Sequence, residues 1–280
     1  MKKNEQRLVL QGMNDIATLA GDKLERYQKK LSKLQVTHKD AQGVVSEADI
    51  NTEKFIIKNL RKIFPMADVL GEEDYYVQNK KNTGWENFKS KEWLWIIDPL
   101  DGTSNFLSGL EFYCVCICLA HYGKPKLAVI YWPNKKKSYL AIDGEGSSIL
   151  DRTTRKKKVL KIKDNKKALR DSLVVTGFAA EKGEPFDKEF DLFKNVMAKA
   201  RGVRRLGSAA LDMCLVSEGL FGAFWERGLA PWDMAAAGLI AKESGLRVGT
   251  YQNKKFCPFE ETICVGTKKT YPELITILKS

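Results

Sequence analysis

The sequence predicts a layered α+β or α/β sandwich. Apolar runs of strand length and amphipathic stretches with helical spacing both recur along the 280 residues, and they are only partly segregated. With 44% hydrophobic residues, the chain can bury a substantial core as one large domain or two closely packed ones. We place the boundary near residue 150. This gives an N-terminal α+β half, 1–150, and a C-terminal α/β half, 151–280.

Two helices are expected at the start of the chain. Apolar residues recur with helical spacing opposite a charged face over 6–34. The residues from 36 to 45 are polar and predict a connecting segment. A second helix follows, which Asp49 or Asn51 can cap and which Pro65 ends.

A short strand then runs into a cluster of acids. Val69-Leu70 is apolar, and Gly71 and three acidic residues follow directly. Glu72, the first of these acids, belongs either to a solvated acidic turn or to a cation site built with other carboxylates. The polar, lysine- and asparagine-rich residues 75–91 predict a loop or a mobile lobe.

The stretch Trp93–Phe106 carries the strongest chemical signal. Its first five residues are apolar and predict a buried strand, which is broken by Asp98 and Asp101. Carboxylates at the end of a buried strand are costly unless a cation or hydrogen bonds meet them. The two acids and the Leu100 carbonyl can converge on one point, and oxygen-only ligands suit Mg²⁺. The alternative is an Asx-type turn in which the acids only cap the next element.

The residues after the second acid predict a phosphate contact and then a sheet. The backbone N–H groups of Gly102-Thr103-Ser104-Asn105 could open a helix and meet a phosphate. Beyond them, apolar runs separated by turns predict an antiparallel meander with a basic edge strand. The apolar runs lie at 112–121, 127–131 and 138–142, and the edge strand is expected around Val159, Leu160 and Ile162 in the basic segment 152–167.

The second half alternates strand and helix. Extended segments are expected at 172–176, 203–206, 220–225, 246–248 and 262–266, and helices at 186–200, 208–216, 231–241 and from 271 onward. Asp233 lies in the first turn of an otherwise apolar helix. It either interacts with the dipole of its own helix or adds a carboxylate to the same cation site.

Composition narrows the chemistry further. The two His residues argue against a His-based triad and a His-ligated metal, so carboxylates are expected to carry any catalysis. Cys114, Cys116 and Cys118 alternate in an apolar run, which favours core packing over a zinc site. The net charge of +12 indicates either a solvated lysine-rich surface or attraction of anions, including nucleic acid. The lysine runs lack interleaved aromatic residues, which argues against nucleic acid.

No targeting signal is evident. The N-terminal residues lack an apolar signal region, and the longest apolar run, Phe112–Ala120, is too short to span a bilayer. We expect a soluble, cytoplasmic protein without a membrane partner.

Four segments of the chain resemble the inositol monophosphatase family, the Mg²⁺-dependent, lithium-sensitive sugar phosphatases. They are Gly71–Glu73, Asp98–Phe106, Gly207–Ala210 and Trp232–Gly238, the last followed by Glu243-Ser244-Gly245. In the family's order and spacing they cover most of the chain. The resemblance implies the sugar-phosphatase fold, a five-layer αβαβα sandwich, and a homodimer.

The resemblance also implies a site for two to three Mg²⁺ ions. Glu72, Asp98 and the Leu100 carbonyl would hold the first ion. Asp98, Asp101 and Asp233 would hold the second, and a third, weaker ion would depend on Glu72.

The remaining roles follow the family's motifs. Asp49 with Thr103 matches the pair that helps to activate the attacking water, and the amides of Gly102 and Thr103 would bind the phosphate. Glu226 falls where the family hydrogen-bonds substrate hydroxyls, although it could instead pair with Arg227 or Arg204 on the surface. The implied catalytic residues are Glu72, Thr103 and Asp49, and the implied substrate-binding residues are Asp101, Ser208, Ala209, Glu226 and Asp233.

The expected function is a Mg²⁺-dependent phosphomonoesterase that hydrolyses inositol monophosphate or a similar polyol phosphate by attack of a metal-activated water. Ser104-Asn105 favours the inositol-phosphate branch, because the nucleotide 3′-phosphatase branch often has Lys-Glu after the Thr. Alternative substrates on the same fold are fructose 1,6-bisphosphate, histidinol phosphate, NADP and nucleotide 3′-phosphates. A second alternative is an RNA-associated binding protein with a secondary phosphatase activity.

Overall fold

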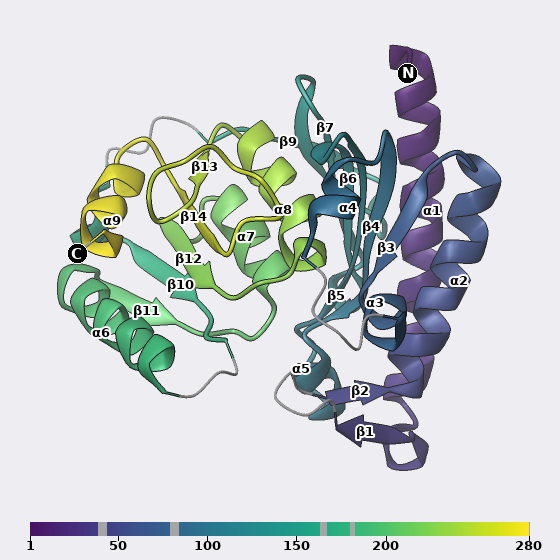
Figure 1. Ribbon diagram of the computed structural model, residues 1–280, viewed down its shortest axis with the longest axis horizontal. Coiled ribbons are helices and arrows are strands. Elements are labelled where there is room, and N and C mark those ends of the chain that lie inside the picture. Colours follow the sequence, from purple (N-terminus) through teal and green to yellow (C-terminus); the bar gives the residue numbers. More distant parts are fainter. Residues whose placement is uncertain (39–43, 79–83, 163–166, 180–182, 280) are drawn as a thin grey trace.

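The computed structural model describes residues 1–38, 44–78, 84–162, 167–179 and 183–279. Two mixed β-sheets alternate with three layers of helices, so that the order across the molecule is αβαβα (Figure 1). The expected five-layer α+β sandwich is therefore confirmed.

The larger sheet has seven strands in the order β3-β4-β5-β6-β7-β8-β9. β3 and β4 are parallel, and every later pair is antiparallel, which confirms the predicted meander. The strands span Asp68–Gly71 (β3), Trp93–Asp101 (β4), Cys114–His121 (β5), Lys124–Trp132 (β6), Lys137–Ile142 (β7), Gly146–Asp151 (β8) and Lys157–Leu160 (β9). The last strand of this sheet, β9, lies beyond the boundary predicted near residue 150. The division of the chain into two halves at that point stays a prediction.

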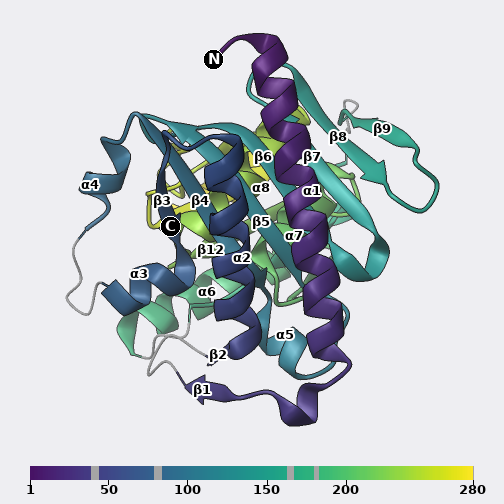
Figure 2. The ribbon, with the colours of Figure 1, turned by 90° about the vertical axis from the view of Figure 1, so that its right-hand side faces the viewer.

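Helices α1 (Lys3–Gln28) and α2 (Glu47–Ile63) cover the outer face of this sheet (Figure 2). Both are amphipathic, and their buried residues pack with the strand residues that point outward, such as Trp95 and Ile117. The polar connection before α2 contains a short antiparallel pair, β1 (Val36–His38) and β2 (Val44–Ser46), which the sequence did not predict.

Helices α7 (Ala209–Ser217) and α8 (Pro231–Glu243) form the middle layer. α7 is buried on all sides, and α8 nearly so, as expected for helices that lie between two sheets. On the larger sheet, Cys114, Cys116 and Cys118 face this layer and belong to its apolar core. The prediction that these cysteines are core residues is confirmed.

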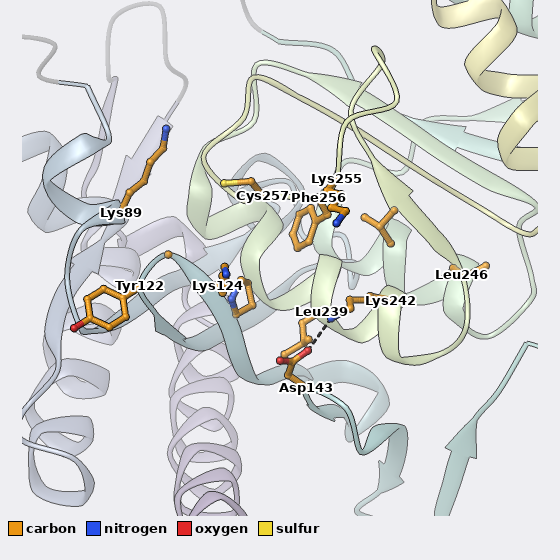
Figure 3. Close-up of a pocket in the computed structure, with 13 residues that line it drawn as sticks. Lys89, Tyr122, Lys124, Asp143, Leu239, Lys242, Leu246, Lys255, Phe256 and Cys257 are labelled. Carbon is orange, nitrogen blue, oxygen red and sulfur yellow. Dashed lines mark hydrogen bonds and ion pairs between the residues drawn. The ribbon is translucent and has the colours of Figure 1, made fainter.

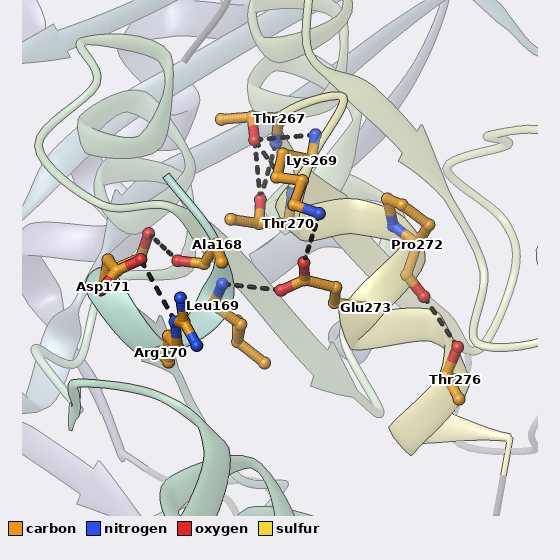
Figure 4. A network of polar contacts seen from close by, with 11 residues as sticks. Ala168, Leu169, Arg170, Asp171, Thr267, Lys269, Thr270, Pro272, Glu273 and Thr276 are labelled. Atoms are coloured by element: carbon orange, nitrogen blue, oxygen red, sulfur yellow. Dashed lines mark hydrogen bonds and ion pairs between the residues drawn. The ribbon is translucent and has the colours of Figure 1, made fainter. Parts of the chain in front are cut away.

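The smaller sheet has the order β11-β10-β12-β14-β13, and α6 and α9 lie on its outer face. Glu273 of α9 accepts hydrogen bonds from the Leu169 N–H at 2.7 Å and pairs with Lys269 at 3.2 Å, which ties the C-terminal helix to the segment before β10 (Figure 4). The elements are β10 (Leu173–Thr176), α6 (Glu184–Lys199), β11 (Gly202–Arg204), β12 (Ala223–Arg227), β13 (Arg247–Gly249), β14 (Thr262–Gly266) and α9 (Thr270–Leu278).

The predicted loop at 75–91 is wrong for the described part of that segment, and 79–83 lies outside the described residues. Two short helices occur there, α3 (Glu72–Gln78) and α4 (Glu86–Lys89). The rings of Tyr75 and Trp85 lie 5.6 and 5.8 Å from the ring of Trp232 on α8. This aromatic packing orders the segment, and its partner is too distant in sequence to be seen from local composition. No described helix is long and apolar enough to cross a membrane.

Candidate active site

The end of β4 places two carboxylates on one face of the larger sheet. Asp98 and Asp101 are three positions apart, and on a regular strand such residues point to opposite faces. Here Asp98 lies opposite Cys116 and Asp101 lies opposite Cys114, so three steps on β4 match two on β5. This bulge, between Asp98 and Asp101, brings both acids to the same face.

The third carboxylate comes from the middle layer. Asp233 lies in the first turn of α8, and its carboxylate accepts a hydrogen bond of 2.7 Å from the Ala230 N–H. One carboxylate oxygen from each of Asp98, Asp101 and Asp233 lies within 4.8 Å of the others. The structure therefore brings together three acids that the sequence placed in one site.

The electrostatics of this carboxylate cluster favour a cation. Burial, followed by repulsion from Glu72 and Asp101, raises the pKa of Asp98 well above its ordinary value. Burial and the charges of Asp101 and Glu72 act in the same direction on the pKa of Asp233. Full ionisation of such a cluster requires a compensating positive charge, and carboxylate oxygens are ligands suited to Mg²⁺.

Glu72 approaches the cluster from the first residue of α3, and it lines the same cavity as Asp101 and Asp233. Glu53 of α2 holds this end of α3. Its carboxylate accepts hydrogen bonds from the Glu73 N–H at 2.9 Å and the Asp74 N–H at 2.8 Å.

Sequence reasoning missed Glu53. Its side chain is only 3% exposed, and burial raises the pKa of its carboxyl to about 7. A Cβ on Gly71 would lie 2.5 Å from a Glu53 carboxylate oxygen, so glycine is needed there for the close approach. The sequence could have identified Glu53 as a candidate, because it is four positions after Asp49 and therefore lies on the same face of the helix.

Asp49 and Thr103 form a hydrogen-bonded pair. The Thr103 hydroxyl has two acceptors within reach, Asp49 Oδ1 at 3.2 Å and the Leu100 carbonyl at 3.0 Å. Asp49 also accepts a hydrogen bond of 2.8 Å from the Ser46 N–H. The prediction that Asp49 or Asn51 caps α2 is wrong, because Ser46 is the N-cap and Asp49 is the third helical residue of a capping box.

Helix α5 (Thr103–Leu107) follows β4 directly, and Gly102 is its N-cap. Gly102 has a φ of 93°, a left-handed conformation that favours glycine. Gly102 and Thr103 line a cavity of about 330 Å³ together with the acids Glu72, Asp101, Asp212, Glu226 and Asp233. The predicted phosphate-binding residues thus adjoin the carboxylate cluster.

Asp101 is fixed from the opposite side of the cavity by the start of α7. The Ser208 hydroxyl and the Ala210 N–H both donate hydrogen bonds to its Oδ2, the second at 2.9 Å. Ser208 is also the N-cap of α7, so the geometry of this helix end and of the carboxylate are set together. The Cys114 Sγ atom also lies 3.7 Å from Asp101 Oδ2. The prediction of Cys114 as a core residue did not anticipate this contact.

Glu226 lies at the far end of the cavity, near the end of β12. It is 7% exposed, which rules out the alternative of a surface pair with Arg227 or Arg204. Arg227 pairs with Glu189 at 3.5 Å. Burial, followed by repulsion from Asp101, raises the pKa of Glu226 to about 8, although Arg205 lowers it.

Asp212 is a second cavity residue that sequence reasoning missed. It lies on α7 and is 1% exposed. Burial, and then repulsion from Asp101 and Glu226, raises its pKa to about 9. Asp212 is an acid within an apolar helix, one turn after Ser208. That position could have identified it from the sequence as a candidate site residue.

A larger cavity, of about 600 Å³, lies near the opposite end of α8 from Asp233 (Figure 3). Its lining is mainly apolar and basic, and it includes Phe256 and Lys255. Its one acid, Asp143, pairs with Lys126 at 2.6 Å and Lys242 at 2.7 Å. This cavity therefore lacks a cluster of acids, and the smaller cavity is the candidate active site.

Comparison with known proteins agrees with this geometry. The model of the inositol monophosphatase family matches residues 5–280. The chain is 31% identical to the Nus factor SuhB of Pseudomonas aeruginosa over 94% of this chain and 93% of that protein. It is 35% identical to an inositol-1-monophosphatase of Rhizobium meliloti over 81% of this chain and 79% of that protein.

Solved structures show the same fold. The extragenic suppressor protein suhB from Bartonella henselae superposes with a TM-score of 0.84 at 31% identity, covering 98% of this chain and 99% of that one. The match extends over the complete five-layer sandwich and both sides of the cavity. On this evidence the chain belongs to the inositol monophosphatase family.

Proposed function

We propose that the protein is a Mg²⁺-dependent phosphomonoesterase that hydrolyses inositol monophosphate or a similar polyol phosphate. The observation that carries the proposal is the carboxylate cluster of Asp98, Asp101 and Asp233, whose oxygens lie within 4.8 Å of one another. The cluster adjoins Gly102 and Thr103 on one side and Glu226 on the other.

The donor set fits Mg²⁺. All its atoms are hard oxygens, and the raised pKa values of Asp98 and Asp233 are those expected for acids that a cation normally neutralises. The carboxylates with Glu72 and the Leu100 carbonyl would hold two to three ions. Bound Mg²⁺ supplies Lewis-acid activation of water and neutralises charge on the phosphoryl oxygens.

The chain's own residues orient the reactants. The Thr103 hydroxyl has one proton and two acceptors within reach, Asp49 and the Leu100 carbonyl, and in the proposed mechanism it donates to Asp49. The Thr103 oxygen is then free to accept a hydrogen bond from the attacking water. The amides of Gly102 and Thr103 bind the phosphate, and Glu226 binds hydroxyls of the leaving alcohol.

The test is phosphate release from a panel of esters with and without Mg²⁺. The panel contains inositol monophosphates, fructose 1,6-bisphosphate, histidinol phosphate, NADP, a nucleotide 3′-phosphate and p-nitrophenyl phosphate. We expect Mg²⁺-dependent release that is fastest with the polyol monophosphates. A folded protein that released phosphate from no member would refute the proposal, and preference for another member would select that substrate.

Asp101→Asn and Asp233→Asn should each lower kcat/KM by about a hundredfold or more, because each removes a charged metal ligand. Asp143→Asn is the matched control, since Asp143 lies in the other cavity and pairs with Lys126 and Lys242. Turnover near the wild-type level in either cluster variant would show that the metal ligands are assigned wrongly.

A second candidate function is an RNA-associated role in transcription. It is favoured by the relatives named Nus factor and by the net charge of +12. The basic run Arg155–Lys158 is exposed at the edge strand of the larger sheet. RNA binding should survive Asp101→Asn, and Lys156→Ala should reduce the slope of log K against log salt by about 0.7. Salt-independent binding, or none, would exclude this role.

The family resemblance further suggests lithium inhibition and a homodimer. Phosphate release measured across a lithium titration, and light scattering of the purified protein, test these two properties directly.

A further inference from the structure

Asp212 is a buried acid in the cavity for which the proposed mechanism has no use. It is the fourth residue of α7, and its side chain is 1% exposed. It lines the cavity between Asp101, which belongs to the metal site, and Glu226, which lies on the alcohol side. Its position is therefore beside the part of the substrate that leaves with its hydroxyl groups.

One oxygen of the Asp212 carboxyl has no hydrogen-bond partner within the described protein. Its Oδ1 atom is fully buried without a hydrogen bond, and no described side chain forms an ion pair with it. A buried carboxyl of this kind is costly for folding, and such groups in native proteins call for an explanation. Two other buried acids on helices are satisfied: Glu53 accepts two backbone hydrogen bonds, and Glu189 accepts one from Tyr251.

The surroundings suit a neutral hydroxyl better than an anion. A second anion is disfavoured beside Asp101 and Glu226. A carboxylic acid that keeps its proton offers one donor and further acceptor positions, which match the one donor and two acceptors of a sugar hydroxyl. Two such groups, Asp212 and Glu226, line the same cavity wall.

We propose that Asp212 is a specificity-determining residue that hydrogen-bonds a hydroxyl of the alcohol part of the substrate, alongside Glu226. The inference rests on the proposed function and adds the class of alcohol that the site selects. The leaving alcohol must carry a hydroxyl beyond the ester oxygen that reaches the α7 side of the cavity. Alcohols without such a hydroxyl gain nothing from Asp212.

The experiment compares inositol monophosphate with p-nitrophenyl phosphate, whose leaving group has no free hydroxyl. Asp212→Ala should raise KM for the inositol ester about tenfold, the factor of one hydrogen bond, and leave KM for the nitrophenyl ester unchanged. Asp212→Asn, which keeps a donor and an acceptor, should stay within a few fold of wild type on both. Ser217→Ala is the control, because Ser217 is buried on the same helix and bonds only the Met213 carbonyl.

Equal losses on both esters, or an unchanged KM for the inositol ester, would overturn the proposal in favour of a structural role. If Asp212→Ala does not fold, inositol monophosphates that each lack one hydroxyl decide the matter with the wild-type enzyme. With the wild-type enzyme, at least one of these deoxy esters should have a kcat/KM about tenfold below that of inositol monophosphate, and Asp212→Asn should show the same difference. If no deoxy ester has a lower kcat/KM, the contact is refuted.

Failure of the proposed function is distinguishable from failure of this inference. A wild-type protein that hydrolyses neither ester refutes the first. Calorimetric titration with free myo-inositol then tests the second without turnover. Weaker binding to Asp212→Ala than to Ser217→Ala supports the contact, and equal binding to the two variants overturns it.

Discussion

Burial dominates the chemistry of the single residues around the active-site cavity. Asp98, Asp101 and Asp233 lie so close together that ionisation of all three is unfavourable without a cation, and Asp212 and Glu226 line the same cavity. All five pKa values are raised, with burial as the largest cause. On the functions proposed above, the same property would prepare one group of acids for metal binding and the other for hydrogen bonding to hydroxyls.

The raised pKa of Asp212 predicts a pH-dependent cost to stability. Between its ordinary pKa of 3.8 and about 9, the folded state keeps a proton that the unfolded state has lost. The free energy of unfolding of the metal-free protein should therefore fall as pH rises through this window. Asp212→Asn cannot ionise, so it should stabilise the protein more at pH 8 than at pH 5.

Urea unfolding in EDTA at the two pH values measures this difference. Ser217→Ala serves as the control, since it changes no titratable group. A stabilisation by Asp212→Asn that is equal at both pH values would contradict the assignment of a raised pKa.

At the scale of elements, three helix ends position the site. α5 begins beside the carboxylate cluster, the N-cap of α7 is Ser208, whose hydroxyl donates to Asp101, and Asp233 lies in the first turn of α8. The short helix α3 differs, because a side chain from α2 fixes its first turn. Glu53 accepts hydrogen bonds from two of its backbone N–H groups, and Glu72 is the first residue of that turn.

Removing this anchor should weaken metal binding without removing a ligand. Glu53→Ala leaves two backbone N–H groups of α3 without their acceptor and lets Glu72 move, so the apparent Mg²⁺ affinity should fall about tenfold. Gly71→Ala should act in the same direction, because its Cβ would displace the Glu53 carboxylate. The Mg²⁺ concentration for half-maximal phosphate release measures the effect.

Glu86→Ala is the matched control for these variants. Glu86 lies in the neighbouring helix α4, and its side chain is 84% exposed. A similar loss of Mg²⁺ affinity in Glu86→Ala, or none in Glu53→Ala, would show that Glu53 does not position the metal site.

At the scale of the whole molecule, the carboxylate cluster joins separate layers. Asp98 and Asp101 belong to the larger sheet, and Asp233 belongs to the helices between the sheets. The cavity is completed by Glu226 from the smaller sheet. A cation bound to the cluster would therefore link the larger sheet to the helices between the sheets.

Mg²⁺ should for this reason raise the melting temperature. At a concentration of about 100 times Kd, binding to the folded state adds about 2.7 kcal/mol, which corresponds to roughly 5 °C or more for a chain of this size. Asp98→Asn should abolish the shift, and Asp143→Asn should retain it. A shift of equal size in Asp98→Asn would place the ion elsewhere.

Most elements of the fold could be predicted because their burial patterns are local. The meander β5–β7 follows from apolar runs between turns, and α1 follows from its helical spacing. The described parts of 75–91 were predicted as a loop because the helical order there depends on Trp232. The sequence of a polar segment does not show which distant residue its aromatic side chains will pack against.

The sequence by itself determined the family, and it indicated the residues on which the proposed chemistry depends, namely two acids at the end of a buried strand and one in the first turn of an apolar helix. Only the tertiary structure decided how the acids meet. A bulge places Asp98 and Asp101 on one face of the sheet, Glu53 accepts hydrogen bonds from the first turn of α3, and Asp212 lines the cavity. The physical reason is that periodicity records which side of an element is buried, whereas a site depends on which distant elements are packed against that side.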